Sequence, residues 1–380
     1  MIVEELTAIP LEVRLTRPFS GSTYTITKRC TTVVRISVDG GRSATIWGGD
    51  EKSYGLELAG YLNGPIRDVL VGRDPTMVTA LWTAMADMVR EVQSVEPDEA
   101  RERHLRMKAI ALADIALWAL LAEVADMPLY RVMGGYSSAL PVIGIVGYHT
   151  PGSPLDGLRR EVERCANMGL GGVKLKVGHG TLKEDLARIG AVREVGGRDF
   201  MIACDANMGW SLAQATSFVR ALEAEKFELI WLEEPVGWLH QYDGMSRLRE
   251  RQSTPICSGQ NEILATECKQ LILRGCVDVL NTDVTVCGGI TPWRDLAGMA
   301  ALWPSVRMAH HEEPQIAMHL LASAPNAVCV ELFPDPARDP IWDGLPASKP
   351  KISQGKLHLP DGPGLGVEID WDFVDKWKVA

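Results

Sequence analysis

Ionisable and amide side chains follow a series of short apolar segments in the second half of the chain. They are Lys174, Lys176, Asp205, Asn207, Glu233, Glu234, Gln260, Glu262, Asp283, His311 and Glu331. If such segments are the parallel strands of one barrel, their carboxyl ends meet at the rim where catalytic groups lie. Packing does not explain charged groups there, because barrel interiors are normally filled with Val, Ile and Leu. The pattern therefore predicts a catalytic site.

Two carboxylates and a further group of oxygen donors come from successive segments. Asp205 and Glu233 end two of them, and oxygen donors follow Gly259 in the next one. Mg²⁺ takes hard oxygen ligands and keeps positions open for substrate. Each acid alone could instead be a solvated strand end or a helix N-cap, but the three together favour a metal site.

Lys174 and Lys176 are two residues apart on one predicted strand, so their side chains leave the same face. Two buried ammonium groups are costly unless a function holds them there. Neighbouring cations depress each other's pKa, and a lysine then becomes a base near neutral pH. The alternative is that both face outward and reach solvent along their aliphatic stems.

His311 and Asp283 suggest a second base. A carboxylate that accepts a hydrogen bond from one ring nitrogen fixes the tautomer and leaves the other nitrogen free to take a proton. His310 points the other way by strand alternation and is assigned a structural role. Glu331 could hydrogen-bond an enolate oxygen if it is protonated, or could form an ordinary salt bridge.

Eight apolar runs, each followed by a turn and a helical segment, would position these groups. The runs are Pro141–Tyr148, Gly172–Val177, Phe200–Asn207, Leu229–Pro235, Thr254–Gln260, Val277–Asp283, Val306–His311 and Ala327–Phe333. They predict a (β/α)8-type TIM barrel, an α/β fold of roughly 200 to 250 residues. A doubly wound open sheet is the alternative, but no GxGxxG follows the first run.

The N-terminal region has a different pattern. Ile2–Leu15 and Thr31–Ile46 alternate apolar and polar residues, with a hairpin turn at Asp39-Gly40-Gly41, and Pro18–Thr27 reads as a flexible loop. Met77–Met133 has helical periodicity. We therefore expect an α+β capping domain at 1–135, a barrel at 136–350 and a C-terminal segment at 351–380 that packs back on the cap.

Composition limits the partners. Lys and Arg number 39 and Asp and Glu 49, and the net charge of −10 argues against nucleic acid or an anionic membrane. The most apolar helical stretch, Ile110–Met127, contains three acids and is expected to be a core helix rather than a membrane span. No export signal is visible, and the 8 cysteines are scattered. A cytoplasmic protein with reduced thiols is expected.

As a set, these residues resemble the enolase superfamily, and within it the mandelate racemase/muconate lactonizing enzyme family. The motifs are Lys174-x-Lys176, Asp205-x-Asn207, Trp231-Leu-Glu-Glu-Pro235, Asp283 followed by Gly288-Gly289, His311 and Glu331. The resemblance covers essentially the whole chain. Relatives of muconate cycloisomerase carry a lysine on the sixth strand, where this chain has Asp283. That difference favours the racemase and acid-sugar dehydratase branch.

The resemblance implies a chemical role for each group. Asp205 and Glu233 would bind one Mg²⁺. Lys176 and the His311–Asp283 pair would be acid/base groups on opposite faces of the substrate.

The same resemblance implies groups that hold the substrate. Lys174 would bind its carboxylate and lower the pKa of Lys176, while Asn207 and Glu331 would contact substrate or intermediate. Two capping loops, Ser20–Thr25 and Trp47–Tyr54, would close over the site, with Tyr24 and Tyr54 as candidate contacts. Relatives are commonly dimers to octamers, so a homo-oligomer is expected.

One departure from the family pattern concerns the third metal ligand. The residue after Gly259 is Gln260 where a Glu is expected. The Gln260 amide oxygen could coordinate, or Glu262 could replace the missing carboxylate. We favour Glu262, because two carboxylates alone should hold Mg²⁺ less firmly. A third interpretation is that metal binding has been weakened.

The expected chemistry is removal of the proton α to a carboxylate, which gives an enediolate. Loss of a β-hydroxyl would make the enzyme a dehydratase of a sugar acid, which the resemblance favours. Return of a proton to the other face would make it a racemase or epimerase of a 2-hydroxy acid. The alternative of another class is a catalytically retired barrel that acts as a binding protein.

Overall fold

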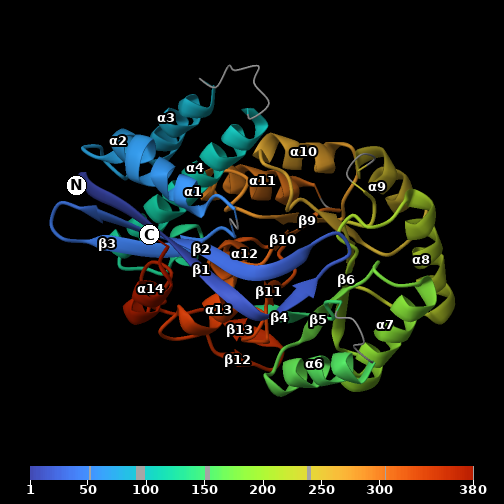
Figure 1. The fold of residues 1–380 in the computed structure, drawn as a ribbon. Helices are drawn as coiled ribbons and strands as arrows, with labels where there is room; N and C mark the ends of the chain where they lie inside the picture. Colours follow the sequence, from blue (N-terminus) through green and yellow to red (C-terminus); the bar gives the residue numbers. More distant parts are fainter. Residues whose placement is uncertain (51–52, 91–98, 150–154, 238–240, 304, 380) are drawn as a thin grey trace.

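The computed structural model describes residues 1–50, 53–90, 99–149, 155–237, 241–303 and 305–379 (Figure 1). The chain begins with a three-stranded antiparallel sheet of β1 (Val3–Ser20), β2 (Thr25–Val38) and β3 (Ser43–Gly48). The predicted hairpin turn is confirmed, since Gly40 and Gly41 at positive φ connect β2 to β3. The predicted Pro18–Thr27 loop is shorter in the structure, because β1 and β2 continue pairing until Ser20 and Thr25.

Helices follow the sheet in the cap. They are α1 (Gly55–Tyr61), η1 (Leu62–Ile66), α2 (Arg67–Leu70), α3 (Val78–Arg90), α4 (Glu99–Val124) and α5 (Leu129–Val132), and residues 91–98 lie outside the described part. The periodicity of Met77–Met133 predicts α3, α4 and α5, whereas the first three helices were not predicted. The middle of α4, from Ala109 to Leu120, is buried on every side. It lies between β3 of the cap and α11 of the barrel, which is why an all-round apolar stretch suits it.

Eight parallel strands in the described ranges form the barrel, and they match the eight predicted runs. They are β4 (Ala139–Val146), β5 (Gly172–Lys176), β6 (Met201–Asp205), β7 (Trp231–Glu233), β8 (Ile256–Ser258), β9 (Val279–Thr282), β10 (Arg307–His310) and β11 (Val330–Leu332). Neighbours pair in sequence order from β4 to β10, and β11 pairs with β4. A bridge between Met308 and Ala327 joins β10 to the segment before β11, so the sheet curls into a modified TIM barrel.

The barrel helices lie outside the strands (Figure 1). They are α6 (Leu155–Asn167), α7 (Leu182–Gly196), α8 (Leu212–Glu225), α9 (Gln241–Arg249), α10 (Ala265–Leu273), α11 (Ile290–Leu302) and α12 (Pro314–Ser323). Thr181 and Ser211 cap α7 and α8 with complete capping boxes, in which side chain and backbone satisfy each other. In the described part of the chain, no helix is both long and apolar enough to cross a membrane.

The barrel interior is layered. Its apolar layer consists of Ile143, Ala203, Trp231, Cys257, Val279, Ala309 and Cys329. Because strand side chains alternate, the residue two positions later points inward as well. From four of these residues that step reaches Asp205, Glu233, His311 and Glu331. The polar groups predicted from the sequence therefore form the next layer toward the carboxyl ends.

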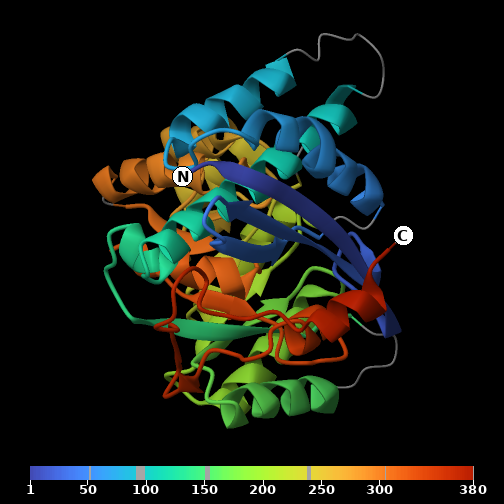
Figure 2. The same cartoon turned by 90° about the vertical axis from the view of Figure 1, so that its left-hand side faces the viewer.

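The last part of the chain contacts both halves of the molecule. It contains α13 (Pro340–Gly344), β12 (Ile352–Ser353), β13 (Lys356–His358) and α14 (Trp371–Trp377). β13 pairs with β4, while α14 packs beside β1 of the cap (Figure 2). A separate core joins Leu11, Val33 and Trp47 to Trp342 and Val374. The exact boundaries between the three predicted regions stay a proposal.

Asp114 on α4 links the cap to the barrel. It is fully buried and accepts hydrogen bonds from the amide (2.8 Å) and hydroxyl (2.6 Å) of Thr291 at the start of α11. Gly289 lies so close that a Cβ there would be 2.5 Å from an Asp114 oxygen. Burial raises the pKa of Asp114 to about 7, although the hydrogen bonds from Thr291 oppose this.

Asp114→Ala is expected to lower the free energy of unfolding by about 1 to 3 kcal/mol, because the Thr291 donors lose their acceptor. Asp114→Asn should keep one acceptor and lose less. Since the folded pKa is raised, stability from this group is present below about pH 4 and lost as the pH rises to about 7. Urea unfolding at several pH values gives the free energy of unfolding of the wild type and of Asp114→Asn. The difference between the two proteins should decrease as the pH rises from about 4 to about 7. An unchanged slope would contradict the assignment.

Candidate active site

A cavity of about 390 Å³ lies over the carboxyl ends of the barrel strands. From the barrel, it is lined by Asn207, Glu234, Gln260, Asp283, His311 and Glu312, among others. From the cap, it is lined by Phe19, Tyr24, Arg29, His104 and Lys108, among others. Cap and barrel thus build the cavity together.

Lys174 and Lys176 both face the barrel interior and are buried. Lys174 Nζ lies 2.7 Å from Glu331 Oε2 and 3.1 Å from Glu233 Oε1, and Lys176 Nζ lies 2.5 Å from Asp205 Oδ2. The outward-facing alternative is therefore wrong.

The sequence predicts that the two neighbouring lysines depress each other's pKa. Burial does act in that direction, but the charges of Glu233 and Glu331 outweigh it and raise the pKa of Lys174. Asp205 does the same for Lys176. A cation that bound Asp205 and Glu233 would compete with both lysines for these carboxylates.

Asp205 and Glu233 stand opposite each other on β6 and β7, and both are fully buried. Asn207 donates its backbone amide to Asp205 Oδ1 (2.8 Å) and its side-chain amide to Oδ2 (3.1 Å). Trp231 Nε1 donates to Glu233 Oε2 (3.0 Å). Burial and the charge of Asp205 raise the pKa of Glu233 to about 7.

Gln260 and Glu262 differ in position. Gln260 lines the cavity, where its Nε2 donates to Glu234 Oε2 (3.2 Å) and its Oε1 accepts from Asn281 (3.2 Å). Glu262 accepts a hydrogen bond from Gln241 (2.5 Å) and, like Asp205 and Glu233, is not among the residues that line the cavity. Gly259 between β8 and these residues has a φ of 139°. The structure thus places Gln260 at the cavity, and the choice between Gln260 and Glu262 as third ligand stays a proposal.

His311 directly follows β10 and meets Asp283, which directly follows β9. Its Nδ1 lies 3.2 Å from Asp283 Oδ2, and its Nε2 lies 3.6 Å from Glu312 Oε1. Burial lowers the pKa of His311, but the charge of Glu312 and the hydrogen bond to Asp283 outweigh this and raise it to about 9. His310 is buried on the other side and its Nε2 accepts from the Val284 amide (3.1 Å), in line with a structural role.

Asp283→Asn is expected to lower the pKa of His311 by at least about one unit, since an opposite charge and its hydrogen bond are lost. With the pKa of His311 raised and that of Asp283 lowered, the pair stabilises the fold fully between about pH 4 and about pH 6.5. The contribution disappears as the pH rises through about 9, and also as the pH falls below about 4. NMR titration of the histidine ring checks the shift. The buried His319, whose pKa burial lowers to about 4, serves as an internal control that should not move.

Glu331 lies at the centre of the polar layer. One of its oxygens pairs with Lys174 and accepts from the Glu312 amide (3.4 Å). Its Oε1 is buried and has no hydrogen-bond partner in the described part of the chain, and the same holds for Asn207 Oδ1. The salt bridge that the sequence left as an alternative is formed, and an acceptor oxygen remains available.

Several groups at the cavity were missed from the sequence. Arg29 of β2 pairs with Glu312 (2.9 Å), and Tyr148 has its ring centroid 5.1 Å from Lys176 Nζ. His104 and Lys108 line the cavity from α4. The i, i+4 spacing of His104 and Lys108 places both on one face of a helix, and this was the signal that could have identified them. No local pattern in the sequence reveals the Arg29–Glu312 contact.

The two candidate tyrosines differ. Tyr24 lines the cavity, with its ring centroid 5.9 Å from Lys176 Nζ. Its loop is held over the barrel by Ser22, whose hydroxyl donates to the Ala206 carbonyl (2.6 Å). Tyr54 instead lines a separate hollow of the cap and contacts Arg101, so the structure does not bring it to the cavity. Residues 51–52 of that loop lie outside the described residues.

The rim also contains unusual backbone. Asn207, Met208, Glu234, Glu312 and Glu313 all have positive φ, between 41° and 58°. L-residues adopt this region at a cost, and such residues cluster at functional sites where the surrounding structure holds them. The conformations redirect side chains at three strand ends toward the cavity.

Comparison with known proteins agrees with this fold. Residues 5–134 match the model of the mandelate racemase/muconate lactonizing enzyme N-terminal domain, and residues 157–373 match the enolase C-terminal domain-like model. The chain belongs to the mandelate racemase/muconate lactonizing enzyme family of the enolase superfamily.

Individual relatives have related activities. The chain is 30% identical to L-talarate/galactarate dehydratase of Salmonella typhimurium, over 80% of this chain and 72% of that protein. It is 28% identical to 3,6-anhydro-alpha-L-galactonate cycloisomerase of Streptomyces coelicolor, over 99% and 98% of the two chains. A mandelate racemase/muconate lactonizing enzyme from a marine actinobacterium, solved in complex with magnesium, superimposes with a TM-score of 0.90 at 34% identity, covering 100% and 99%.

Proposed function

We propose that this protein is a Mg²⁺-dependent dehydratase of a sugar acid. The observation that carries the proposal is the joint position of these groups at the carboxyl ends of the barrel strands. Asp283 and His311 line the cavity, and Lys176 and the Asp205–Glu233 carboxylates are buried next to residues that line it. Proton abstraction next to a carboxylate needs a base, charge stabilisation and a proton donor in one place. The dehydratase among its relatives supports the choice of reaction.

The residues present fit Mg²⁺. Asp205 and Glu233 end β6 and β7, Gln260 follows β8, and the oxygen donors of these three residues suit this ion. The described residues contain no cluster of three His, Cys, Asp or Glu side chains placed to hold a metal. When bound, Mg²⁺ supplies positive charge where negative charge develops on the substrate.

The protein's own groups then divide the proton transfers. In dehydration, Lys176 removes the α-proton once its amine is neutral, which requires that its contact with Asp205 be released. Lys174, which Glu331 orients, contacts the substrate carboxylate. Protonated His311, which its raised pKa favours at neutral pH, gives its proton to the departing β-hydroxyl. The C–H and C–O bonds break, water leaves, and the enol product rearranges to a 2-keto acid.

The same two bases support a second candidate function, epimerisation of a 2-hydroxy acid. Lys176 on β5 and His311 after β10 are on non-adjacent strands, so they can reach opposite faces of a bound substrate. Cycloisomerisation occurs in a relative of nearly equal length. A binding protein without turnover is less well supported, because both bases and both carboxylates are present.

A library of mono- and di-acid sugars in D₂O with Mg²⁺ tests the proposal. We expect a 2-keto acid from at least one sugar acid, detected by its carbonyl derivative, and deuterium at its neighbouring carbon. Exchange without a keto product would favour the epimerase. Neither exchange nor product across the library would overturn both functions and leave the binding protein.

We further propose that the substrate is a small carboxylic acid, that the protein acts as a homo-oligomer in the cytoplasm, and that neither nucleic acid nor membrane is a partner. The net charge of −10 supports the last point. The proposed regions are 1–135, 136–350 and 351–380. Sedimentation analysis of the purified protein tests the oligomeric state.

A further inference from the structure

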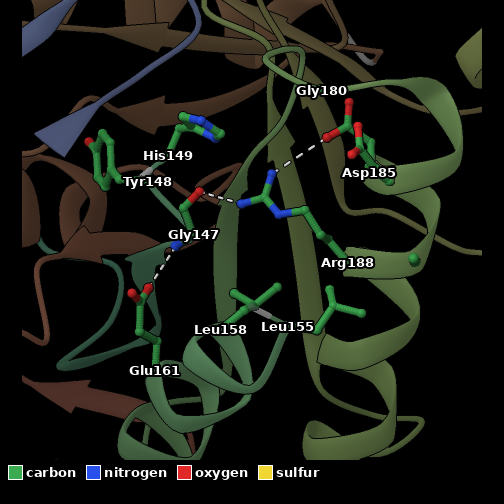
Figure 3. Close-up of a pocket in the computed structure, with 11 residues that line it drawn as sticks. Gly147, Tyr148, His149, Leu155, Leu158, Glu161, Gly180, Asp185 and Arg188 are labelled. Atoms are coloured by element: carbon green, nitrogen blue, oxygen red, sulfur yellow. Dashed lines mark hydrogen bonds and ion pairs between the residues drawn. The ribbon is translucent and has the colours of Figure 1, made fainter. Parts of the chain in front are cut away.

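Two side chains of α7 hold the backbone at the ends of β4 and β5. Arg188 and Asp185 lie beside the segment that follows Lys176, at the edge of a second cavity of about 260 Å³ (Figure 3). We propose that Arg188 is a positioning residue for Lys176, the base of the function proposed above, on which this inference rests.

The contacts of Arg188 are to backbone carbonyls. Its Nη1 donates to the Lys176 carbonyl (2.7 Å), and its Nη2 donates to the Gly147 carbonyl at the end of β4. Asp185, 2% exposed, lies 3.5 Å from the same guanidinium and accepts from the Gly178 amide (3.0 Å). The pair therefore fixes the peptide groups on both sides of Val177.

Gly147 is needed for this arrangement. It has φ 72°, and a Cβ there would lie 2.8 Å from Arg188 Nη2 and 2.4 Å from Leu175. Glu161 accepts a hydrogen bond from the Gly147 amide (2.8 Å) and forms an ion pair with Arg338. The end of β4 is thus held through both its amide and its carbonyl, and a guanidinium can approach because no side chain is in the way.

The consequence reaches the cavity of the active site. Tyr148 directly follows Gly147, and its ring lies beside Lys176 Nζ at 5.1 Å. The Arg188 guanidinium therefore holds the carbonyl of Lys176 and the carbonyl of Gly147, the residue directly before Tyr148. A proton is transferred only when the reacting atoms come within about 3 to 3.5 Å, and a 1 Å displacement can cost about 100-fold in rate.

The test separates the two faces of the substrate. Each of two C2-epimers exchanges its α-proton in D₂O, and Lys176→Met and His311→Asn show which epimer depends on which base. Arg188→Met should slow exchange at the Lys176 face by about 10- to 100-fold, with KM little changed and the His311 face nearly as in wild type. Arg188→Lys, which keeps one donor group, should recover part of the rate.

Arg193→Met is the matched control. Arg193 lies on the same helix and also donates to backbone carbonyls, including those of Gly197 (2.8 Å) and Phe200 (2.9 Å). These carbonyls precede β6, whereas Lys176 pairs with the last residue of that strand, at its other end. If losing such hydrogen bonds lowers only the stability of the fold, Arg193→Met should be less stable. It should still exchange the α-proton at both faces of the substrate at the wild-type rate.

Equal losses at both faces in Arg188→Met, or no loss at either, would overturn the inference. A wild-type protein that exchanges neither epimer would overturn the proposed function and this inference with it. The wild-type rate thus distinguishes the two failures.

Discussion

Lys176→Met is expected to lower turnover by about 10²- to 10⁴-fold, the usual contribution of a positioned acid or base. The substitution removes the amine that lies 2.5 Å from Asp205 and leaves the volume largely filled. His311→Asn should have an effect of similar size. The two variants should differ in α-proton exchange, each losing it at one face of the substrate only.

Two exposed residues give matched controls for this prediction. Lys183→Met changes an exposed lysine, and His358→Asn changes an exposed histidine that contacts Ser353. Both should keep wild-type turnover and exchange. If Lys176→Met loses exchange at both faces while His311→Asn keeps it, one base rather than two carries the reaction.

Asp205→Asn is expected to weaken Mg²⁺ binding by at least about 100-fold. Changes in groups that only support ligands already cost 10- to 100-fold, and Asp205 supplies a charge as well as an oxygen. Gln260→Glu should have the opposite effect, since a third carboxylate replaces a neutral amide at the cavity. Isothermal titration of the metal-free protein with Mg²⁺ measures both changes without any substrate.

Glu262→Gln separates the two interpretations of the third ligand. If Gln260 is the third ligand, the Glu262 carboxylate stays bonded to Gln241, and Mg²⁺ affinity should stay within about threefold of wild type. A loss as large as that of Asp205→Asn would make Glu262 a ligand and contradict the proposed role of Gln260.

Most of the polar layer could be predicted because strand alternation is a strict local rule. Lys174 and Lys176, and the residues two positions after Ala203, Trp231, Ala309 and Cys329, all follow from it. The rule ends after β8, where Gly259 has a φ that other residues rarely adopt. Alternation therefore cannot place Gln260 and Glu262, and the third ligand could not be predicted from it.

Contacts between distant parts of the chain could not be predicted. Arg29 and Glu312 are 283 residues apart, and their ion pair depends on how the cap sits on the barrel. The predicted lowering of the lysine pKa values was wrong for a related reason. Their mutual repulsion is visible in the sequence, whereas the carboxylates that outweigh it come from three other strands.

The core shared by Leu11, Trp47, Trp342 and Val374 has a consequence for synthesis on the ribosome. The cap sheet emerges before α13 and α14, whose residues complete the core on part of its apolar face. Pairing across such a sequence distance is slow and leaves apolar surface exposed meanwhile. Chaperones that bind such surface during translation are therefore expected to stay bound until α13 and α14 have left the exit tunnel.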